Sequence, residues 1–245
     1  MLRMGYYTFR RMIRGYLGLV LLVVVPMLLI SVISLVSAYM HTATYNGVTL
    51  RGMDYAAVSF VLAFQLFGAS YTMNFFQDDL LGERKWRLHS LPLNVQAYGI
   101  SIVATSTLFN ALQGLALILF THWVFDVHWG SFGWALVVLA TLAFFSQIVG
   151  LILILTLKSL KAAERASEVI GIGSMVLAGL VFPLPQGAPF EFLSTYGNPV
   201  SLGATAIFGM AYGSGAQAWI SFGGLLAVSA ALALWAAPLG RRKLA

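Results

Sequence analysis

The sequence contains no cysteine and few charged residues. Charged side chains make up 9% of its 245 residues, compared with about 25% in a typical soluble domain. Without cysteine, the chain has no disulfide framework, thiolate metal site or cysteine nucleophile. Hydrophobic residues make up 60% of the chain, which excludes a disordered protein, because disorder requires low hydrophobicity and high charge. The composition therefore predicts an integral membrane protein.

Common catalytic motifs are also missing. The sequence has no G-x-x-x-x-G-K-[ST] phosphate loop and no H-E-x-x-H metalloprotease motif. His122, Asp126 and His128 lie close together and could ligate a metal, but the tryptophans around them are typical of an aromatic belt at the membrane surface. We therefore expect no catalytic residues, metal or cofactor in this chain.

The apolar residues fall into six long runs. A helix needs roughly 20 apolar residues to cross the hydrocarbon core, and helices satisfy every backbone polar group internally. No acidic or basic residue lies in the middle of a run, whereas proton- or voltage-driven machines normally keep such residues inside the membrane. The predicted all-α fold has spans at 16–40, 55–76, 98–121, 132–157, 169–184 and 217–238.

The basic residues mark one side of the membrane. Thirteen of the 14 lie in the N-terminal segment, the loops after spans two and four, and the C-terminal tail, and only Arg51 lies opposite. Because lysine and arginine are enriched in cytoplasmic loops, both termini are predicted to be cytoplasmic in the cell membrane. These residues are topological anchors and do not form the continuous stripe that nucleic acid requires.

Residues 1–15 are predicted to form an amphipathic helix. At about 100° per residue, its four arginines fall within roughly a quarter of the helical wheel. This pattern is typical of a helix that lies in the membrane interface with arginines toward lipid phosphates. Alternatively, the arginines only set the topology. The four residues are Arg3, Arg10, Arg11 and Arg14.

The loop at 77–97 has an unusual composition for a solvated connection. It reads QDDLLGERKWRLHSLPLNVQA, which mixes acids and bases with leucines and a tryptophan. A short amphipathic helix is predicted from Asp78 to His89, ended by Leu91-Pro92. Its apolar face either packs on a partner or rests on the bilayer surface.

The outer segment at 185–216 is rich in proline but nearly free of charge. We expect it to dip partway into the membrane as a re-entrant helical segment, because irregular backbone at that depth must be buried in protein. The alternative is a seventh span from Pro199 to Ala216, which would place the basic tail outside the cell.

Neutral polar residues recur within the spans. They form close helix contacts or line a translocation path. The amides are the stronger path candidates, because burying an amide in lipid is costly without partners or water. The predicted path residues are Gln65, Thr72, Asn110, Gln113 and Ser174.

Together these features resemble the permease subunit of type-2 ABC exporters. That family has six spans, a basic interfacial helix and a loop segment of the form E-[KR]-x(3–5)-L-x(2)-[LA]-P, which Glu83, Arg84, Leu88, Leu91 and Pro92 match. The proline-rich stretch LAGLVFPLPQGAPFEFLSTYGNPVSLGATAIF matches the family's half-buried outer segment. Many members have Gly-Thr after the charged pair, whereas this chain has Lys85-Trp86-Arg87.

The resemblance implies a function. Two six-span chains, identical or sister permeases, would pair in the lipid membrane and bind two copies of an ABC ATPase that holds ATP and Mg²⁺. Closure of the ATPases would open a path, walled by spans two and five, for a drug, lipid or amphipathic peptide. A gradient-driven transporter and a membrane immunity or scaffold protein are the alternatives. The residues implied to dock the ATPase are Asp78, Leu81, Glu83, Arg84, Trp86 and Leu88.

Overall fold

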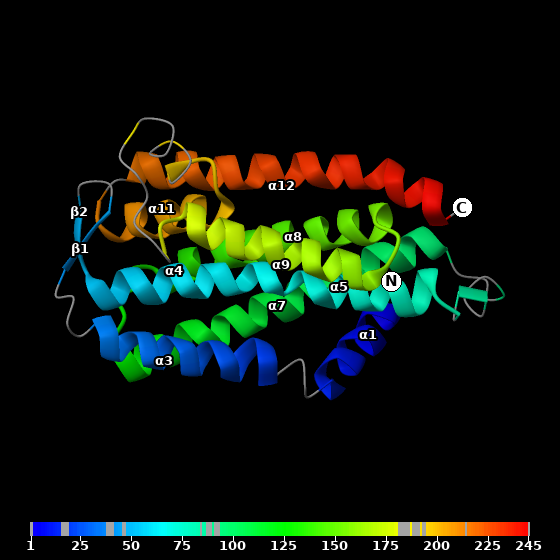
Figure 1. The fold of residues 1–245 in the computed structure, drawn as a ribbon, viewed down its shortest axis with the longest axis horizontal. Coiled ribbons are helices and arrows are strands. Elements are labelled where there is room, and N and C mark those ends of the chain that lie inside the picture. The colour runs from blue at the N-terminus through cyan, green and yellow to red at the C-terminus, as the bar shows by residue number, and fades with distance from the viewer. Residues whose placement is uncertain are drawn as a thin grey trace.

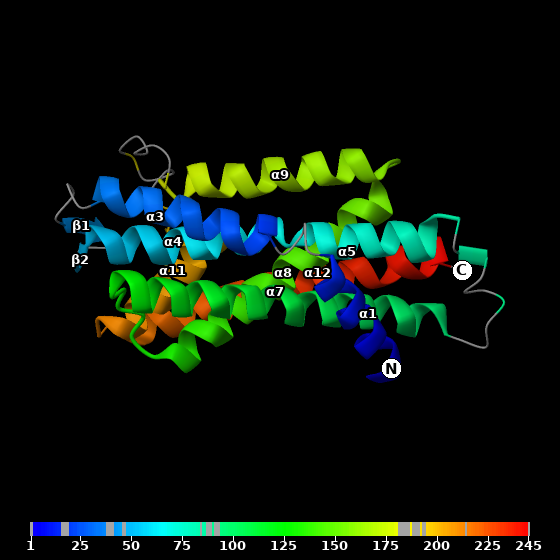
Figure 2. The ribbon, with the colours of Figure 1, turned by 90° about the horizontal axis from the view of Figure 1, so that it is seen from below.

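The chain forms an elongated bundle of helices, shown in a computed structural model (Figure 1). Both termini lie at the same end of the bundle, here called the basic end, and two short strands lie at the other, the strand end (Figures 1 and 2). The structure describes residues 2–15, 20–37, 42–45, 48–83, 85–86, 90, 94–180, 187, 192, 195–213 and 215–244.

Four continuous helical segments in the described chain are long and apolar enough to cross a membrane. The first, Gly52–Leu81, joins α4 (Gly52–Phe67), α5 (Ala69–Phe76) and the π-helical turn η2 (Gln77–Leu81). The other three are α7 (Val95–Phe125), α8 (Phe132–Thr156) and α12 (Gly215–Leu244). They correspond to the predicted spans two, three, four and six and confirm a helical, multi-pass membrane protein.

Shorter elements complete the bundle. The first predicted span falls on η1 (Val20–Val24) and α3 (Val25–Ser37), and α1 (Leu2–Arg14) precedes it. Strands β1 (Thr42–Tyr45) and β2 (Val48–Arg51) pair antiparallel, with Thr42 opposite Arg51. The remaining helices are α9 (Leu160–Leu177) and α11 (Pro199–Ala211).

Two predicted boundaries differ from the structure. The fifth span was placed at 169–184, but α9 starts at Leu160 because Ser159 caps it by accepting a hydrogen bond from the Ala162 amide at 3.3 Å. The loop helix was predicted from Asp78, but η2 continues span two without interruption to Leu81. Gly82 then adopts an extended backbone that ends it. Residues 181–184 lie outside the described chain.

Local signals set other helix ends. Asn94 accepts a hydrogen bond from the Ala97 amide at 3.1 Å and so caps α7. Asn198 caps α11 in the same way, and Pro199 occupies the first helical position, where its missing N–H costs nothing. At the other end of α7, Asp126 takes a left-handed conformation with φ of 51° and turns the chain toward α8.

The apolar core is divided into two parts along span two. The strand-end part contains Leu66 and Phe145, and the basic-end part contains Ala69 and Ile148. Between these pairs lie the half-buried Phe67 and three small or polar buried residues, Gly68, Ser146 and Gln147. A polar layer therefore separates two apolar cores near the point where α4 ends and α5 begins.

Candidate functional site

Helix α1 is tied to the end of span two by a cluster of polar residues, here called the basic-end junction: Arg11, Asp78, Asp79 and Tyr98. Arg11 Nη1 donates to both carboxylate oxygens of Asp79 at 2.8 Å, and its Nη2 donates to Asp78 Oδ2 at 3.1 Å. Tyr98 Oη of α7 donates to Asp79 Oδ2 at 2.9 Å. The junction therefore joins α1, η2 and α7, and α1 runs obliquely to the other helices (Figure 2).

Charge holds this junction together. Asp79 is 4% exposed, so its carboxylate depends on protein partners for its hydrogen bonds. Partial burial alone would lower the pKa of Arg11, but the hydrogen bond and charge of Asp79 and the charge of Asp78 raise it above its ordinary value. The Arg11 guanidinium also lies 4.6 Å from the centre of the Phe75 ring, which adds a cation–π contact. Arg11 therefore remains charged and held in place.

The predicted docking residues belong to this junction or follow it in the sequence. Leu81 is half-buried against the basic-end core, Asp78 pairs with Arg11, and Glu83 is exposed in the turn after η2. Trp86 is 71% exposed, and its ring contacts within the described chain include Lys85 Nζ, 4.9 Å from its centre. Arg84 and Leu88, like Leu91 and Pro92, lie outside the described residues.

The other arginines of the predicted interfacial helix also lie on α1. Arg10 and Arg14 are exposed, whereas Arg11 turns to the carboxylates. Arg3 lies in the first turn of the helix. Tyr6 and Tyr7 on the same helix are 61% and 67% exposed, so α1 presents aromatic as well as basic groups outward.

A break in span two is held together by side chains from neighbouring helices. α4 ends at Phe67, and the Gly68 amide donates to the Gln65 carbonyl at 3.3 Å, as in a tighter turn. Ser146 Oγ donates to the Leu66 carbonyl at 2.8 Å, and Gln147 Nε2 donates to the Gly68 carbonyl at 3.0 Å. The Gly68 carbonyl also accepts from the Tyr71 amide at 3.1 Å, so these side chains add hydrogen bonds between helices to carbonyl groups at the break.

Four of the five predicted path residues lie around this break. Asn110 Nδ2 donates to the Gln65 carbonyl at 2.9 Å, and Gln65, with its amide nitrogen toward α7, donates to Asn110 Oδ1 at 3.1 Å. Thr72 Oγ1 donates to Gln147 Oε1 at 2.8 Å. Gln113 Nε2 donates to Tyr71 Oη at 3.0 Å.

Ser174 lies apart from these four. Its carbonyl accepts a hydrogen bond from Asn198 Nδ2, which connects α9 to the start of α11. All five predicted path residues are buried within this single chain.

Two buried polar atoms on α7 have no hydrogen-bond partner among the described residues. They are Gln113 Oε1 and Ser106 Oγ. The two residues are seven positions apart and therefore lie on the same face of the helix. Unpaired buried polar atoms are costly, so this face of α7 has unused capacity to bind a polar group.

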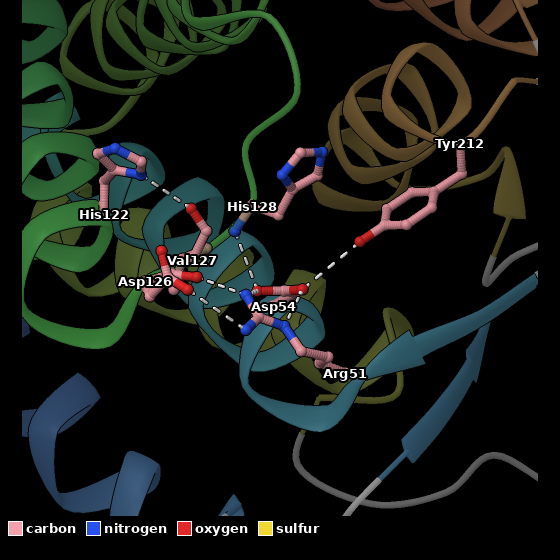
Figure 3. Close-up of polar contacts among 7 residues, drawn as sticks. All are labelled: Arg51, Asp54, His122, Asp126, Val127, His128 and Tyr212. Carbon is pink, nitrogen blue, oxygen red and sulfur yellow. Dashed lines mark hydrogen bonds and ion pairs between the residues drawn. The ribbon is translucent and has the colours of Figure 1, made fainter.

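A second ionic cluster lies at the strand end (Figure 3). Asp54, in the first turn of α4, is 1% exposed and accepts hydrogen bonds from Arg51 Nε and Nη2, both at 2.9 Å. It also accepts from the His128 amide at 3.0 Å and from Tyr212 Oη at 3.4 Å. Asp54 thus connects β2, the loop after α7 and the end of α11.

The possible metal ligands in this region turn to different partners. His122 Nδ1 lies 3.2 Å from the Val127 carbonyl, and the His128 ring packs against Tyr212 (Figure 3). Asp126 Oδ2 lies 3.7 Å from Arg51 Nη1. Within the described part of the chain, no group of three or more potential ligands converges on one point.

Sequence reasoning missed several members of these sites. Gln147 is an amide inside an apolar run, so the argument that selected Gln65 and Asn110 could also have selected it. Tyr98 gave no comparable signal, because tyrosine at a span end usually marks the membrane interface. Asp54 was assigned to the loop before span two, and its burial depends on contacts with residues 74 and 158 positions away.

These features describe a helical, multi-pass membrane protein with a charged junction at one end and a polar layer within the bundle. The sequence model of the ABC-2 type transporter family matches residues 2–212, and the chain belongs to this family. The match includes both ionic clusters and the polar layer and ends before α12. No curated protein and no solved structure gives a significant match. Membership of this family confirms that the chain is a permease component of an ABC transporter.

Proposed function

We propose that this protein is the permease subunit of an ATP-driven exporter for a hydrophobic or amphipathic drug, lipid or peptide. Two permease chains, identical or sister, would pair and bind two ATPase subunits that hold ATP and Mg²⁺. The observation that carries this proposal is the basic-end junction, in which the buried Asp79 contacts α1 and α7 and precedes the exposed Trp86 by seven positions in the sequence. Membership of the ABC-2 family supports the assignment.

In this proposal the chain has six spans, and its basic end faces the cytoplasm of the cell. η1 with α3 forms the first span and α9 the fifth, and α1 lies in the interface. Both termini, whose sequences are rich in arginine and lysine, lie at this end (Figure 1), as positive-inside orientation requires. We also propose that the segment at 185–216, of which 187, 192, 195–213 and 215–216 are described, is re-entrant. In support, α11 has 13 residues, too few to cross, and ten of them are buried.

The junction would carry motion from the ATPase into the membrane. Trp86 is a large exposed apolar group, of the kind that anchors protein interfaces. Displacement of the turn after η2 would move Asp79, and the hydrogen bonds of Asp79 to Arg11 and Tyr98 would transmit this movement to α1 and α7. Because these contacts are charge-assisted and partly buried, they resist separation better than exposed ion pairs do.

The polar layer would act as the hinge and border the path. It separates two apolar cores, so the halves of span two can move relative to each other by exchanging a few hydrogen bonds. When the hinge opens, Gln65, Thr72, Asn110 and Gln113 would border the path, and Ser174 would border its outer part. The unpaired Gln113 Oε1 is available to accept a hydrogen bond from water or substrate.

The docking assignment is tested with a matched pair of tryptophans. Trp86→Ala should abolish co-purification of the ATPase in mild detergent, while the protein still inserts. Trp123→Ala is the control, because Trp123 is 76% exposed on the last turns of α7, at the strand end. Mass spectrometry of the captured complex and its ATP turnover give the result. Equal ATPase recovery with both variants would contradict the assignment.

The hinge is tested by removing one of its amides. Asn110→Leu keeps the number and branching of the side-chain heavy atoms but removes the hydrogen bond to the Gln65 carbonyl. We expect the assembled complex to lose most of its ATP turnover in lipid vesicles without losing subunits. Asn74→Leu is the control, because Asn74 is an exposed amide on span two outside the polar layer. Unchanged turnover in Asn110→Leu would assign Asn110 to packing alone.

A further inference from the structure

An apolar groove lies at the basic end, between α7 and α12. α8 forms its floor with Phe144, Ile148 and Leu151. Its volume is about 410 Å³, within the range of small-molecule sites. It extends from Arg241 to Ala233 along α12, which is about 12 Å at 1.5 Å per residue.

The groove exists because the facing positions carry small residues. Ala236 is buried against the basic-end core, whereas Ala237 is exposed, so α12 packs on α8 and leaves its outer side uncovered. A Cβ atom at Gly240 would lie 4.0 Å from the Leu155 side chain, at the outer limit of van der Waals contact, so this position has room for a small side chain. The small lining residues are Gly99, Ala104, Ala233, Ala236, Ala237 and Gly240.

Charge is confined to one end of the groove. Gln96 and Arg241 are the polar residues among those that line it, and no acidic residue does. Arg241 forms no ion pair with any residue in the described part of the chain, and Arg242 and Lys243 follow it. The remaining wall is apolar. The groove thus combines an apolar channel with a basic mouth.

We propose that this groove binds one acyl chain of an anionic phospholipid, with the lipid phosphate at Arg241. Hydrocarbon suits the apolar wall, and the guanidinium can donate two parallel hydrogen bonds to phosphate. Lipid also fits the position, because only 22% of the most apolar stretch of α12 is buried, compared with 61–67% in the other three spans. A second copy of the chain fits less well, because a two-fold contact here would bring two basic tails together. This inference does not depend on the proposed transport function.

Lipid binding to the purified protein in detergent tests the charged mouth. Native mass spectrometry would compare phosphatidylglycerol with phosphatidylcholine of the same acyl chains. Arg241→Gln should weaken phosphatidylglycerol binding about fivefold and leave phosphatidylcholine binding nearly unchanged. Arg242→Gln removes the same charge from a residue that does not line the groove, and it should have a smaller effect. Equal losses in the two variants would indicate unspecific attraction and overturn the site.

A second pair of variants tests the acyl-chain position. Ala237→Leu should fill the groove and weaken phosphatidylglycerol binding about tenfold, which corresponds to roughly two lost methylene contacts. Ala230→Leu is the control, because Ala230 is exposed two turns away on the same face of α12 and does not line the groove. Unchanged lipid binding in Ala237→Leu would overturn the proposal. Loss of a dimer peak with lipid binding intact would assign the groove to a second copy of the chain.

Discussion

The two ends of the bundle use the same pair of groups in different ways. At the basic end Arg11 binds Asp79, and at the strand end Arg51 binds Asp54; both carboxylates are almost completely buried. Arg11 and Asp79 are 68 positions apart, so their pair joins α1 to span two. Arg51 and Asp54 are three positions apart, so theirs only orders the start of α4.

The difference shows which residue makes each long-range connection. At the basic end the connection to α1 is made by the arginine, because Asp79 already lies on span two. At the strand end each partner makes its own: Asp54 reaches the His128 amide and Tyr212, and Arg51 reaches the backbone carbonyl of Asp126. The ion pair itself therefore joins distant elements at the basic end, where one Arg11 nitrogen contacts both Asp79 oxygens. At the strand end the pair is local, with two Arg51 nitrogens each contacting one Asp54 oxygen.

Removing the two arginines should give the largest contrast. Arg11→Ala leaves Asp79 buried with Tyr98 as its main donor, and we expect a loss of about 2–3 kcal/mol, below the full cost of breaking a buried pair because Arg11 is 39% exposed. Arg51→Ala leaves Asp54 with the His128 amide and Tyr212 and, because the Arg51 side chain is 54% exposed, should cost about 1 kcal/mol. Thermal unfolding in detergent measures both. Equal losses would contradict the comparison.

Replacing the strand-end carboxylate should have an intermediate effect. Asp54→Ala removes the acceptor for the His128 amide and for Tyr212, and we expect a loss of about 2 kcal/mol, mostly from the unpaired amide. It should therefore exceed the effect of Arg51→Ala. A double-mutant cycle between Arg51 and Asp54 isolates their pairwise energy. A coupling equal to the whole loss would show that Asp54 makes no separate connection.

Matched tyrosine variants should give the smallest contrast. Tyr98→Phe removes a 2.9 Å hydrogen bond to a nearly buried carboxylate and should cost about 1.5 kcal/mol. Tyr212→Phe removes a 3.4 Å contact and should cost less than about 0.5 kcal/mol. Unfolding curves measured under the same conditions give the two values. A larger loss for Tyr212→Phe would mean that the strand end is held more tightly than its geometry indicates.

Features that depend on residues close together in the sequence were predicted, with two exceptions. Spans two, three, four and six followed from the apolar runs, and the family followed from the order of charged and apolar segments. The start of α9 was missed, because Ser159 caps a turn that contains Lys161 and Glu164 and the apolar run begins only later. The break at Gly68 was also missed, because glycine within an apolar run is equally compatible with a continuous helix.

The sequence by itself determined that the chain is a membrane protein and where these four spans lie, because hydropathy and charge act on each segment independently. The partners of the buried polar groups were decided only by the tertiary structure. Asp79 meets Arg11 across 68 positions, and Gln147 reaches the Gly68 carbonyl across 79. A low-dielectric interior requires each such group to find a partner, but which partner it finds depends on how the helices pack.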